Sequence, residues 1–135
     1  MKKYLLDTNI CIYFTKGLYD LKEKITEIKV ENCFISEITI AELKFGIENS
    51  DSANREQNRK VINSFIAGIN VLPIFPCLDF YAREKTQLRK LGTPTDEFDL
   101  LIGSTAVVND LILVTNNEKH FKRISEIKIE NWTNT

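Results

Sequence analysis

The chain has 135 residues, of which 43% are hydrophobic and 27% charged, and its formal net charge is −1. This predicts a single domain (1–135) with a real core, and it excludes a protein that binds nucleic acid by bulk positive charge alone. Three widely spaced cysteines without a CxxC motif, and no apolar stretch of membrane length, favour a bacterial-type cytoplasmic protein with buried thiols over a secreted, zinc-binding or membrane protein.

Short apolar runs alternate with helix-like periodicities along the chain. Taken in order, they predict a strand at 3–6, a short helix through 10–14, a helix at 21–28, a strand at 33–35, helices at 36–47 and 55–69, a strand at 71–74, helices at 78–91 and 97–108, a strand at 111–114, a short helix at 120–121 and an edge strand at 127–129. Strands separated by helices predict an α/β fold, a three-layer α/β/α sandwich around a mainly parallel sheet of four to five strands. The helix pair at about 36–70, joined by a polar loop, is predicted to stand off the sheet as a clip.

Asp7 directly follows the first predicted strand, and Thr8 and Asn9 continue as turn or helix-start residues. A carboxylate just past the end of a buried parallel strand points into the crevice where ligands bind in open α/β sheets. We therefore expect Asp7 to be one of several oxygen ligands of a divalent metal ion. Position alone is equally consistent with a helix N-cap.

Two further carboxylates lie on apolar helix faces. Glu42 shares its face with Ile38 and Phe45, and Asp99 has Ile102 and Ala106 above it. Two carboxylates 4 Å apart repel by roughly 4 kcal/mol at an effective dielectric of 20, so burying several together requires a cation or a proton. Oxygen ligands without histidine or cysteine favour magnesium, or manganese, over zinc, and a metal-bound water can attack a phosphodiester.

Each acid also has a simpler interpretation. Asp99 fits the third position of a capping box opened by Asp96, and Glu42 could lean out to solvent. Asn117, after the predicted strand at 111–114, is commonly a turn or cap residue. Only the metal interpretation accounts for all of these positions together.

Several short motifs, in order along nearly the whole chain, resemble those of the PIN-domain ribonucleases, and within them the VapC-like toxins of bacterial type II toxin–antitoxin pairs. The matching residues are 5–9, 36–43 with Gly46, 92–94, 98–103, 113–117 and 120–121. The resemblance implies a magnesium-dependent endoribonuclease with Asp7, Glu42 and Asp99 as its acidic triad. Asn117 stands where many relatives carry a fourth acid, which implies a neutral amide there and argues against a four-acid site with a firmly bound second metal.

The resemblance also implies partners. They are an RNA substrate, transfer or ribosomal RNA, a small antitoxin that blocks the acidic groove, and a second copy of the chain in a homodimer. Operator DNA is expected to be bound only through the antitoxin, and no membrane is expected.

Four alternatives stay open from the residues alone. The first is a PIN nuclease of RNA processing that is not a toxin, and the second a domain whose acids bind metal without catalysis. The third is a phosphatase with Asp7 as nucleophile, although Asn9 replaces the second carboxylate of that chemistry. His120, the only histidine, is predicted to be a packing or surface residue. The fourth open question is the role of the basic residues of 83–90 and 119–123, which either are only exposed to solvent or contact RNA phosphates.

Overall fold

The computed structural model describes residues 1–134 and contains one five-stranded, all-parallel sheet in the order β3-β2-β1-β4-β5. The strands are β1 (Tyr4–Leu6), β2 (Cys33–Ser36), β3 (Asn70–Leu72), β4 (Ile112–Val114) and β5 (Ile129–Glu130). The predicted mainly parallel sheet is therefore confirmed. The boundary predicted at residue 135 lies outside the described residues, and the single-domain assignment stays a prediction.

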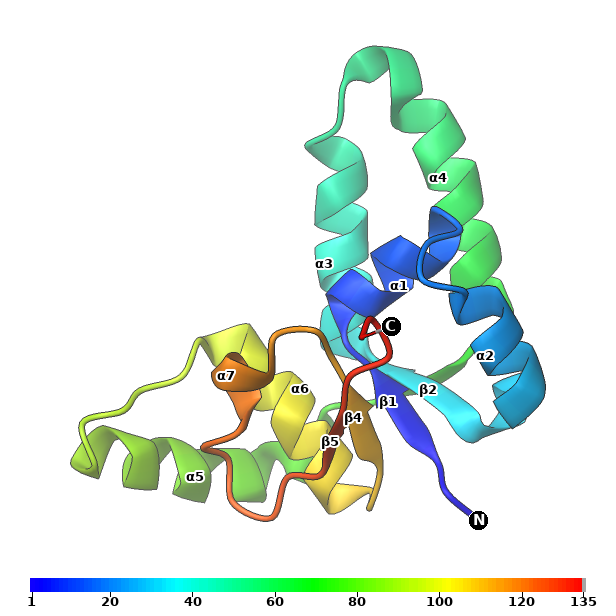
Figure 1. The fold of residues 1–135 in the computed structure, drawn as a ribbon. Helices are drawn as coiled ribbons and strands as arrows, with labels where there is room; N and C mark the ends of the chain where they lie inside the picture. Colours follow the sequence, from blue (N-terminus) through cyan, green and yellow to red (C-terminus); the bar gives the residue numbers. More distant parts are fainter. Residues whose placement is uncertain (135) are drawn as a thin grey trace.

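Seven α-helices and two 3-10 helices connect the strands. They are α1 (Thr8–Thr15), α2 (Leu21–Ile28), η1 (Val30–Asn32), α3 (Glu37–Glu48), α4 (Ser52–Ala67), η2 (Phe75–Cys77), α5 (Leu78–Lys90), α6 (Glu97–Val108) and α7 (Glu118–Phe121). Helices α3 and α4 form a hairpin that extends away from the sheet, whereas α5, α6 and α7 lie together on its other side (Figure 1). None of the described helices is long and apolar enough to cross a membrane.

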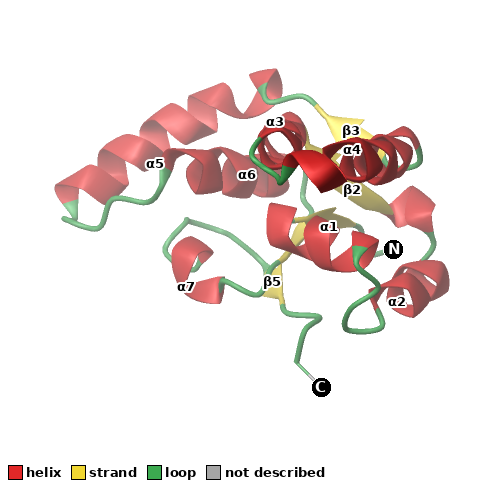
Figure 2. Ribbon diagram, turned by 90° about the horizontal axis from the view of Figure 1, so that it is seen from above, coloured by secondary structure: helices red, strands yellow, loops and turns green. Residues whose placement is uncertain are grey.

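Alternate side chains of the central strand serve two separate cores, because successive residues of a strand point to opposite faces. Tyr4 and Leu6 pack in the core with α1 to α4, and Leu5 packs in the core with α5 to α7. Figure 2 shows the helices on both sides of the sheet. The predicted three-layer sandwich is thus confirmed, with β1 buried in its middle.

The chain order places a crevice between β1 and β4. From β1 the chain builds outward through β2 and β3, and it then returns to add β4 on the other side of β1. In open α/β sheets such a reversal of strand order marks the ligand-binding position, at the carboxyl ends of the strands. Asp7 follows β1 and Thr115 follows β4, so both residues lie at this position.

Most element boundaries differ from the sequence predictions by a few residues, and three of these differences have a clear local cause. Strand β3 covers Asn70–Leu72 and stops before Pro73, which has no N–H for the ladder. Helix α4 begins at Ser52 because the Asp51 carboxylate accepts a hydrogen bond from the Ala53 N–H at 3.2 Å. The last strand is Ile129–Glu130, because the Ile127 N–H is still used in a turn, donating to the Ile124 carbonyl at 3.3 Å.

A glycine in α6 determines how closely α7 approaches. Phe121 and Ile124, at and just after α7, are buried in the core shared with α5 and α6. A Cβ atom on Gly103 would overlap the Cδ1 atom of Ile124. The missing side chain therefore lets the α7 segment lie directly on α6.

Candidate metal centre

Asp7 is held in the crevice by two donors of the chain. Its carboxylate is 5% exposed, and it accepts hydrogen bonds from the Thr8 N–H at 2.7 Å and the Thr115 hydroxyl at 2.8 Å. Asp7 is therefore the N-cap of α1, as its position allowed. The link to Thr115 spans 108 residues and joins the ends of β1 and β4, which makes Asp7 a fixed part of the crevice.

Glu42 is joined to the same place through Thr8. The Thr8 hydroxyl donates to Oε1 of Glu42 at 2.5 Å and lies 3.1 Å from the hydroxyl of the fully buried Thr39. Thr8 thus contacts two acids, Asp7 through its N–H and Glu42 through its hydroxyl. The half-buried Glu42 does not lean out to solvent.

Asp99 lies at the start of α6. Asp96 caps this helix, because its Oδ1 atom accepts from the N–H groups of Phe98 and Asp99, each at 3.1 Å. The Asp99 carboxylate is engaged elsewhere, since its Oδ2 atom lies 3.2 Å from Nδ1 of His120. The predicted capping box is half formed, and the histidine predicted to be a surface or packing residue contacts the acid.

The negative charges of these acids affect one another. Burial raises the pKa of Asp99 to about 6, with the charges of Asp7 and Asp96 adding to the rise and His120 opposing it. Burial also raises the pKa of Glu42, again with contributions from Asp7 and Asp96. For Asp7, burial raises the pKa against the hydrogen bonds from Thr115 and Thr8. The crevice therefore favours a proton or a cation.

The described side chains, as they lie, form no group of three acids, histidines or cysteines that could hold one ion directly. Instead, Thr8, Thr115 and His120 contact carboxylate oxygens of all three acids. The donor set still fits magnesium, which binds through one or two carboxylates and keeps several waters. Oxygen-only donors and the raised pKa values of the acids agree with such a site.

Asn117 is placed next to Thr115. Its N–H donates to the Thr115 hydroxyl at 3.0 Å, while its side-chain amide makes no hydrogen bond with the residues the structure describes. Sequence reasoning missed the contacts that Thr8, Thr115 and His120 make with the acids. The spacing of strand ends gives a signal for Thr115, but nothing local in the sequence identifies the other two.

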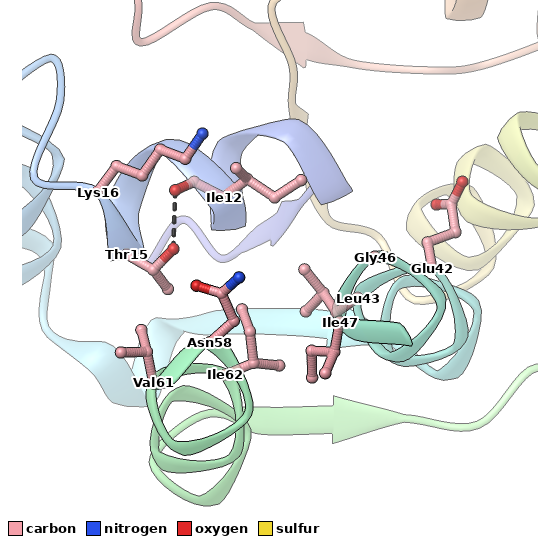
Figure 3. A pocket seen from close by; sticks show the side chains of 10 residues that line it. All are labelled: Ile12, Thr15, Lys16, Glu42, Leu43, Gly46, Ile47, Asn58, Val61 and Ile62. Atoms are coloured by element: carbon pink, nitrogen blue, oxygen red, sulfur yellow. Dashed lines mark hydrogen bonds between the residues drawn. The ribbon is translucent and has the colours of Figure 1, made fainter. Parts of the chain in front are cut away.

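An apolar groove of about 290 Å³ begins beside Glu42 and runs between α1, α3 and α4 (Figure 3). Leu43, Ile47, Val61 and Ile62 supply apolar side chains to its walls, and the Glu42 side chain points away from Leu43 and Ile47. A Cβ atom added to Gly46, also on the wall, would meet no atom within 4 Å. The groove is therefore open along this part of α3.

Comparison with known families finds one match over most of the chain. The model of the PIN domain matches residues 4–127. Ribonuclease VapC2 of Rickettsia felis is 36% identical over 132 residues, which cover 96% of this chain and 97% of that protein. The tRNA(fMet)-specific endonuclease VapC of Shigella flexneri is 33% identical over 135 residues, covering 98% of this chain and all of that protein.

Solved structures agree with these matches. The DNA-bound VapBC of Salmonella typhimurium superposes with a TM-score of 0.87 at 33% identity, covering 98% of this chain and 99% of that chain. VapBC2 of Rickettsia felis, bound to a DNA fragment from its promoter, superposes with a TM-score of 0.84 at 35% identity, covering 96% and 98%.

The raised pKa of Asp99 predicts how stability changes with pH. The pKa of the Asp99 carboxyl group is about 6 in the folded protein, against an ordinary value of 3.8. This difference favours folding below pH 4, and the contribution is lost as the pH rises through 6. We expect Asp99→Asn to stabilise the metal-free protein at pH 8 by roughly 1–2 kcal/mol, a figure reduced from the full shift because of solvent screening. Near pH 4 the difference should disappear. Urea unfolding in EDTA from pH 4 to 8 measures both.

Asp79→Asn on the exposed surface of α5 is the matched control, because it removes the same charge outside the crevice. It should not stabilise the protein at pH 8, because a negative charge in the first turn of a helix is favourable. Equal stability of wild type and Asp99→Asn at pH 8 would contradict the electrostatic description of the crevice.

The Thr8 hydroxyl is predicted to position Glu42. Thr8→Val keeps the shape and the N–H that Asp7 needs but removes the donor to Glu42, whereas Thr8→Ser keeps both. We expect kcat for RNA cleavage to fall about 10-fold or more in Thr8→Val and to stay near wild type in Thr8→Ser, as for other residues that orient a site carboxylate. Steady-state kinetics, with circular dichroism to check folding, measures this. A fully active Thr8→Val would disprove the role.

Proposed function

The chain belongs to the PIN-domain family and is a VapC-type ribonuclease, the toxin of a toxin–antitoxin pair, and on this premise we propose that it hydrolyses RNA with a magnesium ion bound at Asp7, Glu42 and Asp99. The observation that supports the metal is that burial raises the carboxyl pKa of all three acids, and that the charge of Asp7 adds to the rise at Glu42 and Asp99. Manganese has the same ligand preference and is the alternative ion.

Each acid has a distinct role in this proposal. Asp7 and Asp99 would hold the ion, and Glu42 would bind at its edge, orient the attacking water and take its proton. Asn117 positions water or ligand through its neutral amide. A bound magnesium ion would lower the pKa of its water and neutralise charge on the phosphate. The phosphatase and the non-catalytic domain considered from the sequence are not supported, because the relatives at 33–36% identity are ribonucleases by name.

We propose transfer RNA as the substrate class, because two relatives at 33% identity are named tRNA(fMet)-specific endonucleases. We further propose that residues 1–135 form one nuclease domain located in the cytoplasm, with α3 and α4 as its clip. Homodimerisation also stays a prediction; Phe45 and Phe75, 68% and 80% exposed, offer apolar surface for it.

The antitoxin is proposed to occupy the apolar groove between α1, α3 and α4. The groove begins at Glu42, so a chain lying in it would reach the acidic crevice at one end. Solved relatives are VapBC complexes, some of them bound to DNA. We propose that operator DNA contacts this protein only through the antitoxin.

Metal and acid dependence test the catalytic proposal. Initiator tRNA(fMet) and an elongator tRNA, as transcripts, are incubated with the protein in magnesium, in manganese and in EDTA. We expect cleavage of the initiator with either metal and none in EDTA. Asp7→Asn should lower the rate at least about 100-fold, since several kcal/mol of charge stabilisation would be lost. Cleavage that survives both chelation and Asp99→Asn would exclude this mechanism.

Gly46 tests the antitoxin groove. Because a side chain there meets empty space, Gly46→Ala should fold and bind the antitoxin normally, and the helix should gain about 1 kcal/mol. Gly46→Glu places a charge in an apolar contact and should weaken antitoxin binding about 100-fold or more while RNA cleavage persists. Calorimetric titration with the antitoxin encoded beside the toxin gives the affinities. Equal binding by the two variants would place the antitoxin elsewhere.

A further inference from the structure

A second hollow, of about 250 Å³, lies on the other side of Asp99 from the apolar groove. One of its walls is the start of α6, with Asp96 and Asp99, and the other is the α7 segment, with Lys119, His120 and Arg123. Figure 1 shows α7 beside α6 at this place. The two walls therefore carry opposite charge.

The basic wall is held in a fixed position relative to the acids. His120 contacts Asp99 at 3.2 Å across the hollow. Behind the wall, Ile124 is 2% exposed, and the buried Glu84 carboxylate of α5 accepts a hydrogen bond from the Ser125 N–H at 2.7 Å. Both contacts attach the segment that follows α7 to the helices beneath it.

The cations of this wall are not neutralised by the chain. Lys119 and Arg123 are both exposed, and neither forms an ion pair within residues 1–134. By contrast, Lys85 of the other basic cluster pairs with Glu97 at 2.9 Å. Of the two clusters seen in the sequence, only the one at 119–123 contributes to a hollow that also contains Asp99.

We propose that this hollow binds a backbone phosphate of the RNA strand, with Lys119 and Arg123 as its ligands. A phosphodiester at this place can turn one oxygen toward a cation on the acidic wall and the other toward the two basic side chains. The acidic wall alone would repel the phosphates of an RNA strand. The positive charges of the basic wall offset this repulsion and attract the strand to the crevice. The inference rests on the proposed function, because it needs an RNA substrate and a metal ion.

Charge-removing variants in a non-cleaving background test the site. All proteins carry Glu42→Gln, and binding of a 5′-fluorescein-labelled 20-nucleotide single-stranded RNA is measured by fluorescence anisotropy in magnesium at 50–200 mM NaCl. We expect Lys119→Gln/Arg123→Gln to raise Kd at least about 10-fold and to reduce the slope of log Kd against log salt by about 0.7, the value for one phosphate contact on a single strand.

Lys2→Gln/Lys60→Gln is the matched control, because it removes the same charge from exposed residues outside the 119–123 cluster, and neither residue lines the hollow. It should change Kd about 2-fold at most. Lys119→Arg/Arg123→Lys keeps the charges and should bind like the parent protein. In the active background, the pocket variant should raise KM and leave kcat within a few-fold of wild type.

Two failures can be told apart. If wild type cleaves RNA but the pocket and control variants bind it equally, the phosphate site is wrong and the proposed function stands. If wild type cleaves no RNA and the Glu42→Gln protein binds none, both are overturned.

Discussion

A carboxylate buried at the end of a central parallel strand must receive hydrogen bonds or a cation, and Asp7 is in this situation. Thr8 and Thr115 supply hydrogen bonds, and these same contacts connect β1 with α1 and with the end of β4. The strand order makes the arrangement possible, because the order of the strands reverses between β1 and β4. Burial raises the pKa values of Glu42 and Asp99, and the negative charge of Asp7 adds to both.

The sequence predicts the parts of the site that follow from local order. Asp7 could be placed because an apolar strand stops there, and the bounds of α6, which carries Asp99, follow from Asp96 as a cap. The contacts between these parts could not be predicted. Thr8 is an ordinary helix-start residue until α3 is packed beside it, and His120 contacts Asp99 only because the buried Phe121 places α7 on α6.

The crevice combines both signs of charge over a short distance, which a net charge of −1 conceals. Such a site has separate places for two kinds of ligand: a metal ion would bind the acidic side chains, and the phosphates of a nucleic-acid strand would bind the basic side chains. Together the two ligands would neutralise both walls. The apolar groove on the other side of Glu42 has neither charge pattern and suits a protein chain. Surfaces of three different characters thus meet around three carboxylates, and each would suit one of the ligands proposed above: metal, RNA and antitoxin.

The absence of a side chain at Gly103 affects the geometry of the site, although Gly103 is not itself one of the proposed ligand-binding residues. Because α7 lies on α6 only as closely as this position permits, volume added at Gly103 would be transmitted through Ile124 to the segment that carries His120 and Lys119. Catalytic strength would then be graded by the size of one interior residue, while the groove proposed for the antitoxin, built from α1, α3 and α4, is left unaltered. A toxin attenuated in this way would remain fully subject to its inhibitor.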